Sequence, residues 1–193
     1  APAGVSEEQV QAVWLQLSTE YPEPPLPIQS ADAYTLKGWF AESLRALKDR
    51  YPNLQVAYLS SREYGGYAKT NWNPEPYAYE SGLSVRWTIL GQIEYMRTGF
   101  FWDTRVGTLD HSRNAPWISW GPYFWADGET PRSDGLTWSE SDFGPTGDLL
   151  SEQGAQKTSE MLLDFLLREP TASWFRSGVE VPARQRRVRP ARH

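Results

Sequence analysis

Leu54-Gln-Val-Ala-Tyr-Leu59, which runs into Ser60-Ser-Arg-Glu-Tyr-Gly-Gly-Tyr67, is the stretch that decides the fold. Its first six residues form a short apolar run with β-branched and aromatic members, which predicts a buried strand. The next eight are polar or aromatic, and their paired glycines allow close approach of the backbone. We therefore expect a strand that ends in a loop of polar and aromatic side chains.

Similar signals occur on both sides of this stretch. An apolar run at 10–17 predicts another buried strand, and 115–120 predicts a third strand. Helical periodicity predicts helices before Tyr51, over about 77–97 and after Ser151. The helix over 77–97 carries two apolar stripes, so we expect it to be largely buried. We expect the last helix to bury five residues, namely Ala155, Thr158, Leu162, Phe165 and Leu166. Strands alternating with helices predict an α/β fold, a doubly wound parallel sheet in three α/β/α layers.

Composition predicts one domain over residues 1–175 and a basic tail over 176–193. The tail holds six Arg and one Glu and so has a net charge of +5. Because the whole chain has a net charge of −5, the other 175 residues have a net charge of −10. An acidic body disfavours nucleic acid as a partner. No apolar run approaches the ~20 residues of a membrane span. The chain has no Cys and two His, which excludes disulfides, thiol catalysis and His-rich metal sites, and no cofactor is implied.

Aromatic residues are unusually frequent. The chain has ten Trp and ten Tyr, and five of the Trp (102, 117, 120, 125 and 138) fall between Phe100 and Ser139. Two interpretations stay open for them. They pack the core and loops, or they line a cleft in which flat side chains stack on sugar rings.

Ligands of parallel α/β sheets bind beyond the carboxyl ends of the strands. That rule selects residues 16–18, 60–64 and 120–125 as the rim of a cleft. The predicted ligand-binding residues are seven of these rim residues and two further carboxylates, namely Ser60, Ser61, Arg62, Tyr64, Trp120, Tyr123 and Trp125, with Glu75 and Glu80. Alternatives remain for several of them. The serines also suit turns that satisfy the backbone, and Arg62 suits a structural ion pair with Glu63, Glu75 or Glu80.

Several phrases occur in the order typical of one family. They are Tyr58–Ala68, Asn73–Gly82, Trp120–Gly128, Arg132–Trp138 and Asp142–Phe175. Over about residues 5–175 the chain resembles the C-terminal two-thirds of bacterial SGNH (GDSL-type) hydrolase-like proteins, a mostly secreted group. The resemblance implies an SGNH/flavodoxin-like architecture, an extracellular or periplasmic location and descent from ester hydrolases.

Two departures from the family pattern argue against its chemistry. The Gly-Asp-Ser block of the nucleophile is absent from this sequence, and the Asp and His of the last block correspond to Thr146 and Leu149. Thr does not orient an imidazole as a carboxylate does, and Leu accepts no proton. His111 precedes a predicted strand, on the side away from the usual site, so we expect a surface role for it.

These observations predict a catalytically degenerate domain that associates with carbohydrate or supports assembly. Two alternatives stay open. One is an active carbohydrate esterase or acylhydrolase whose nucleophile lies on a segment outside this chain, and the other is a structural subunit of an extracellular assembly. The resemblance also implies a central first strand that this sequence lacks. Because unpaired strands are unfavourable, we expect an N-terminal segment or a neighbouring copy to complete the sheet, or a sheet rebuilt with fewer strands.

Overall fold

The computed structural model describes residue 4 and residues 6–176, and the Arg-rich stretch predicted as a tail lies outside the described residues from 177 onward. Three parallel strands form one sheet in the order β1-β2-β3, namely β1 (Ala12–Gln16), β2 (Val56–Ser60) and β3 (Trp117–Trp120). They alternate with the helices α1 (Asp32–Arg50), α2 (Tyr77–Thr98) and α3 (Glu152–Arg168). Three short 3₁₀ helices are η1 (Glu7–Gln9), η2 (Glu140–Asp142) and η3 (Pro170–Ala172). The predicted α/β class, with a parallel sheet alternating with helices, is confirmed.

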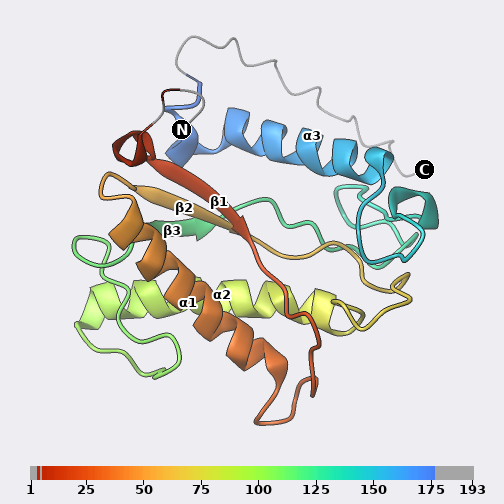
Figure 1. Ribbon diagram of the computed structural model, residues 1–193, viewed down its shortest axis with the longest axis horizontal. Helices are drawn as coiled ribbons and strands as arrows, with labels where there is room; N and C mark the ends of the chain where they lie inside the picture. Colours follow the sequence, from red (N-terminus) through yellow and green to blue (C-terminus); the bar gives the residue numbers. More distant parts are fainter. Residues whose placement is uncertain (1–3, 5, 177–193) are drawn as a thin grey trace, which may run out of the picture.

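Helices cover both faces of the sheet (Figure 1). On one face, α1 and α2 contribute buried residues such as Phe40, Leu44 and Val85, which pack with Ala57 and Leu59 of β2. On the other face, a smaller cluster joins residues of β2 and η3 (Val56, Tyr58 and Ala172) to the partly buried Phe165 and Leu166 of α3. The α1/α2 face therefore holds most of the apolar core.

The central strand is β2, because it pairs with β1 on one side and β3 on the other. All five of its residues are buried. The prediction that the first strand is buried was wrong, because β1 is an edge strand whose residues are half-buried and whose Trp14 is 39% exposed. The three strands pair consecutively, so a further strand would join at β1 or at β3.

The apolar stripes of α2 are less buried than predicted. Leu90, Ile93 and Met96 are 45%, 52% and 40% exposed. The face of α2 that meets α1 carries small polar residues, because the Ser84 hydroxyl donates to the Ala33 carbonyl at 2.8 Å and the Thr88 hydroxyl to the Lys37 carbonyl at 3.4 Å. Apolar side chains of α2 are thus left at the surface. Even so, none of the described helices is long and apolar enough to cross a membrane.

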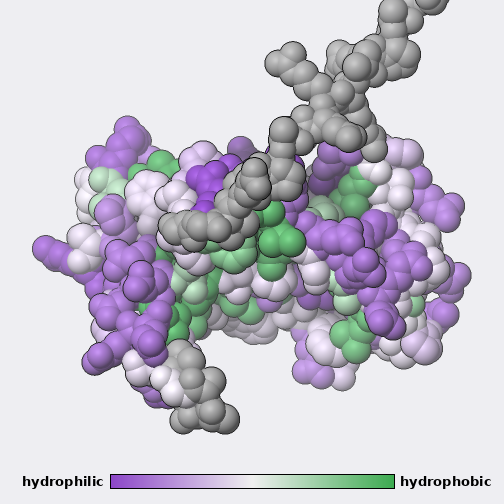
Figure 2. Space-filling model, turned by 90° about the horizontal axis from the view of Figure 1, so that it is seen from above, coloured by the Kyte–Doolittle hydropathy of each residue, from purple (hydrophilic) through white to green (hydrophobic). Residues whose placement is uncertain are grey.

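The last helix also differs from its prediction. Of the five residues predicted to be buried, Thr158 is buried, Ala155 is exposed, and Leu162, Phe165 and Leu166 are half-buried. The physical reason is that α3 covers a sheet of three strands, and the described part of that sheet is narrow. Figure 2, which looks at the molecule from above the view of Figure 1, shows hydrophobic residues at the surface between hydrophilic ones.

Candidate functional site

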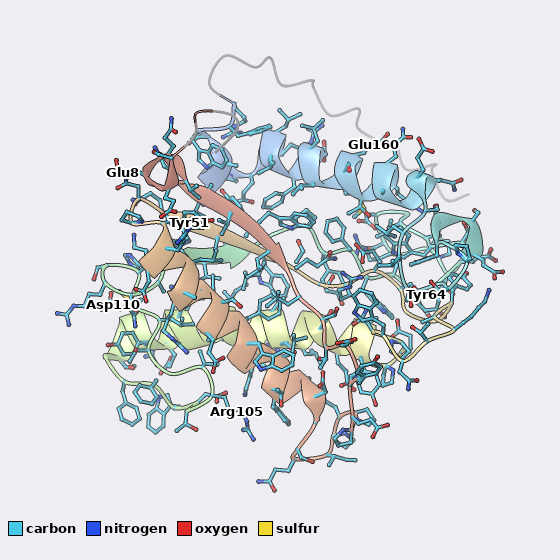
Figure 3. All side chains as sticks on the ribbon, viewed as in Figure 1. Glu8, Tyr51, Tyr64, Arg105, Asp110 and Glu160 are labelled. Atoms are coloured by element: carbon cyan, nitrogen blue, oxygen red, sulfur yellow. The ribbon has the colours of Figure 1, made fainter. Side chains whose placement is uncertain are left out.

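Except for Glu80, the predicted site residues gather at the carboxyl end of the sheet, in the loops that follow β2 and β3 and in the segments 71–79 and 132–151. We call these loops the strand-end cluster. In Figure 3, Tyr64 marks the cluster at one end of the molecule, and Asp110 marks the opposite end.

Ser60 and Ser61 are completely buried. The Ser61 hydroxyl accepts hydrogen bonds from the backbone N–H groups of Phe124 at 2.9 Å and Trp125 at 3.2 Å. The Ser60 hydroxyl accepts one from the Trp14 indole at 2.9 Å. These bonds tie the end of β2 to β1 and to the loop after β3, so the two hydroxyls satisfy donors of the protein itself.

Glu75 fixes the position of Trp125. Its Oε1 accepts hydrogen bonds from the Trp125 indole at 2.8 Å and the Gly65 amide at 2.9 Å, and its Oε2 accepts one from the Tyr79 amide at 3.2 Å. The rings of Trp125 and Tyr79 pack edge to face with centroids 4.8 Å apart. Both predicted residues therefore connect the start of α2 to the loop after β3.

Arg62 forms the ion pair with Glu63 that the sequence offered as one alternative, with Nη2 and Oε2 3.5 Å apart. Its Nη1 also donates to Oε1 of Gln16 at 3.2 Å, and Gln16 Nε2 donates to the Ser61 carbonyl at 2.8 Å. Among the described residues its buried Nε has no hydrogen-bond partner. The guanidinium thus braces β1 against the loop after β2.

The other aromatic residues predicted at the rim differ in exposure. Tyr64, Tyr123 and Trp125 are half-buried, whereas Trp120 is 37% exposed. Burial raises the pKa of Tyr64 and of Tyr123, so both phenols stay protonated at neutral pH. Arg132 donates to the Tyr123 carbonyl at 2.7 Å and lies over the Tyr123 ring. Trp120 is thus the one rim aromatic of these four with an exposed ring.

Glu80 belongs to a different neighbourhood. It is 5% exposed, and its Oε1 accepts a hydrogen bond from the Leu26 amide at 2.9 Å. Its buried Oε2 has no partner among the described residues. Burial raises the pKa of Glu80, and the bond from Leu26 opposes that rise. Glu80 therefore holds the Pro-rich segment 21–27, which connects β1 to α1, rather than the strand-end loops.

Thr146 and Leu149, which occupy the degenerate positions, lie in a tight turn. The Thr146 hydroxyl bonds Asp148, while Leu149 is 52% exposed. Gly147 has a φ of +72°, and a Cβ at this position would lie 1.9 Å from the Tyr67 carbonyl oxygen. Only glycine fits this approach, so the turn is held against the loop after β2 by its backbone.

The sequence did not single out the strongest polar group of the cluster. The carboxylate of Asp142, 1% exposed, accepts hydrogen bonds from the Ser139 amide at 2.9 Å, from Gln153 at 3.0 Å and from the Lys157 ammonium at 2.9 Å. Burial alone would raise the pKa of Asp142, but these bonds outweigh it and hold the pKa below its ordinary value. The Lys157 ammonium also lies over the Trp138 ring, 4.6 Å from its centroid. A Ser-x-x-Asp spacing before a helix was the available signal.

No described imidazole lies beside the serines. His111 is exposed, and its ring packs against the edge of Trp117 with centroids 5.2 Å apart. It follows Asp110, which lies at the end of the molecule opposite Tyr64 (Figure 3). Within residue 4 and residues 6–176, no group of three or more acidic, His or Cys side chains is placed to hold a metal ion.

The hollow between the strand-end loops is small. It measures about 10 Å³ and is lined by residues that include Arg62, Tyr64 and Asp148. A volume of about 10–15 Å³ accommodates one water molecule. The hollow lined by these residues is therefore large enough for about one water molecule.

Neither the family models, nor the curated proteins, nor the solved structures searched contain a match to this chain. Its function has to be inferred from its own sequence and geometry.

Proposed function

We propose that this chain is a non-catalytic, SGNH-hydrolase-like domain of an extracellular or periplasmic protein, and that it acts by binding carbohydrate. The proposal that the domain is not a catalyst rests on one observation, the packing of side chains in the strand-end cluster. The hydroxyls of Ser60 and Ser61 accept hydrogen bonds from the protein, and the hollow lined by the residues that follow them, 62–65, measures about 10 Å³.

A serine nucleophile needs a neighbouring base and a place for the substrate. The turn that would supply the base holds Thr146 and Leu149, and His111 directly follows Asp110, which lies at the other end of the molecule (Figure 3). The phrases shared with the SGNH group and the parallel α/β sheet support common architecture. A domain that keeps this architecture can lose the ester hydrolysis typical of the group.

Carbohydrate is the ligand class that the aromatic surface favours. Large flat rings remain exposed on the molecule, among them Trp102 at 76%, Trp117 at 48% and Trp120 at 37%. Aromatic faces stack on the apolar faces of sugar rings, while the sugar hydroxyls bond polar neighbours. For a domain with exposed aromatic rings and no catalytic centre, carbohydrate binding is the simplest function.

The chemistry is tested by incubating the purified chain with a fluorophosphonate probe and, separately, with para-nitrophenyl acetate. We expect no labelling and a hydrolysis rate equal to that of a Ser60→Ala/Ser61→Ala variant. Labelling of a serine in the wild-type chain would contradict the proposal and favour the active esterase or acylhydrolase.

A structural role in an extracellular assembly is a second candidate, favoured by the open edge of β3. An apolar hollow of about 490 Å³ lies between β3 and α2, lined by side chains that include Ile93, Met96, Trp117 and Trp120. An N-terminal segment or a neighbouring copy that adds a strand would have to join at β3 or at β1. Light scattering after size exclusion tests assembly from this chain alone. A monomer of 22.0 kDa would count against it.

A further inference from the structure

A groove crosses the outer surface of α1 and α2, on the side of these helices away from the sheet. Two hollows of about 390 Å³ and 510 Å³ share Tyr34, Lys37, Trp102 and Asp103 as lining residues, so they form one continuous depression. The walls come from α1, α2 and the loop 100–107. Arg105, at the lower edge of the molecule in Figure 3, marks its position. We call this depression the outer groove.

The floor of the outer groove consists of two stacked aromatic rings, Tyr34 and Trp87, with the ammonium group of Lys37 over them. Tyr34 and Trp87 stack with ring centroids 5.1 Å apart and planes at 19°. The Lys37 ammonium lies 4.8 Å from the Tyr34 centroid and 5.3 Å from that of Trp87, and it forms an ion pair with Asp103. Because the protein's own ammonium occupies the cation position over these rings, the floor does not require a cationic ligand.

Trp102 forms an exposed but positioned wall. Its side chain is 76% exposed, yet its ring packs edge to face on Phe100 with centroids 4.9 Å apart. Beside it, Arg97 donates a hydrogen bond of 2.7 Å to the Glu94 carboxylate. An aromatic ring that is ordered before binding loses little entropy when a ligand stacks on it.

Two carboxylates in the lining of the outer groove, those of Glu94 and Asp103, are hydrogen-bond acceptors. The bond from Arg97 and the contact with Trp102 hold the pKa of Glu94 below its ordinary value. Burial would raise the pKa of Asp103, but bonds from Lys37 and the Arg105 amide lower it overall. Both carboxylates are therefore ionised at neutral pH. The charged lining residues Lys37, Arg105, Glu94 and Asp103 sum to zero, which fits a neutral ligand.

A ligand for the outer groove thus needs apolar faces for aromatic rings, several O–H donors for two carboxylates and no net charge. We propose that the outer groove binds a neutral oligosaccharide of at least two sugar rings, one in each hollow. Each hollow has a volume within the range of about 300–1,000 Å³ found for small-molecule sites. The proposal rests on the proposed carbohydrate binding for its ligand class, and it moves the site from the strand ends to the outer groove.

The test is a titration of the full chain, followed by tryptophan fluorescence, with cellohexaose, xylohexaose, maltohexaose and chitohexaose, and with tetragalacturonate as a charged probe. We expect at least one neutral hexasaccharide to bind, and Trp102→Ala to weaken it by about tenfold or more. Trp174→Ala, after η3, removes another exposed ring and is the matched control that should leave affinity within about twofold, whereas Trp120→Ala tests the rival site at the strand ends. Glu94→Gln removes an ionised acceptor while keeping the aromatic walls, and it should also weaken binding.

The outcomes separate the two proposals. Hexasaccharide binding that survives Trp102→Ala and Glu94→Gln but is lost in Trp120→Ala would overturn the outer groove and leave carbohydrate binding intact. Binding to none of the hexasaccharides would overturn both. Tighter binding of tetragalacturonate than of every neutral probe would overturn the assignment of a neutral ligand. Serine labelling by the fluorophosphonate probe would overturn the non-catalytic role alone.

Discussion

Trp138 of the strand-end cluster and Trp102 of the outer groove are held in similar ways but exposed very differently. The Trp138 ring packs on Phe143 with centroids 5.7 Å apart, and the Trp102 ring packs on Phe100 with centroids 4.9 Å apart. The first side chain is fully buried, whereas the second is 76% exposed. Contact with a phenylalanine ring therefore does not separate a structural tryptophan from one available to a ligand. The exposure of the ring does.

The same contrast holds for the polar groups. In the strand-end cluster, Ser61, Glu75 and Asp142 each accept at least two hydrogen bonds from protein donors. In the outer groove, Glu94 and Asp103 also accept bonds from protein donors, but their side chains remain 35% and 34% exposed. The first region consumes its polar groups in holding loops together, and the second keeps acceptors at the surface.

The largest expected effect is the difference between one substitution made in the two regions. Trp138→Ala removes a fully buried ring, and we expect it to lower the free energy of unfolding by about 3–5 kcal/mol. Trp102→Ala removes an exposed ring and should change that free energy by less than about 0.5 kcal/mol. Urea denaturation followed by circular dichroism measures both. Equal decreases in the free energy of unfolding for the two variants would contradict the difference between the buried and the exposed tryptophan.

Asp142→Asn should lower the free energy of unfolding by about 2–3 kcal/mol at pH 7, because Lys157 and the Ser139 amide lose an ionised acceptor. The pKa of Asp142 is lower in the folded protein than its ordinary value. The stability it provides is therefore present above the unfolded pKa and lost as the pH falls through the folded one. Denaturation curves should show the gap between wild type and variant closing at acidic pH. A gap that does not change with pH would argue against the ionised pair.

Ser61→Ala should cost about 1–2 kcal/mol of unfolding free energy, because two buried N–H groups lose their acceptor. It should leave saccharide binding unchanged, since Ser61 lies in the strand-end cluster. Thermal denaturation and the hexasaccharide titration measure the two expectations. A variant with full stability and weakened binding would instead place Ser61 at a ligand site.

Glu80→Gln is expected to have the smallest effect, and with the opposite sign. Burial raises the pKa of Glu80, so ionisation above the unfolded pKa costs folding free energy. The amide removes that cost at neutral pH, and the variant should equal or exceed wild-type stability by up to about 1 kcal/mol. The advantage should vanish below the unfolded pKa. Strong destabilisation at pH 7 would show that the carboxylate has an ionic partner.

The order of strands and helices could be read from the sequence, because periodicity and turn residues are local properties. Burial could not, since it depends on which elements meet. Trp14 is exposed because β1 is an edge strand, and Leu90 is exposed because α1 packs on Ser84 and Thr88 of α2 instead.

The candidate sites were less predictable than the fold. Rules for parallel sheets led to Ser61 and Trp125, which the structure does bring together, with the predicted Glu75 bonded to the Trp125 indole. Whether they face a cleft or each other depends on side-chain packing that spacing does not encode. The outer groove was missed because Lys37 and Asp103 lie far apart in the chain. Only the packing of α1 against α2 and the loop 100–107 brings them into contact.

The most direct test follows the indole N–H signals of the ten tryptophans by NMR while the bound hexasaccharide is titrated into the full chain. Ligand in the outer groove should shift the signals of Trp102 and Trp87 and leave those of Trp125 and Trp138 in place. Shifts confined to Trp120 and Trp125, with Trp102 unmoved, would contradict the account and return the binding site to the strand ends.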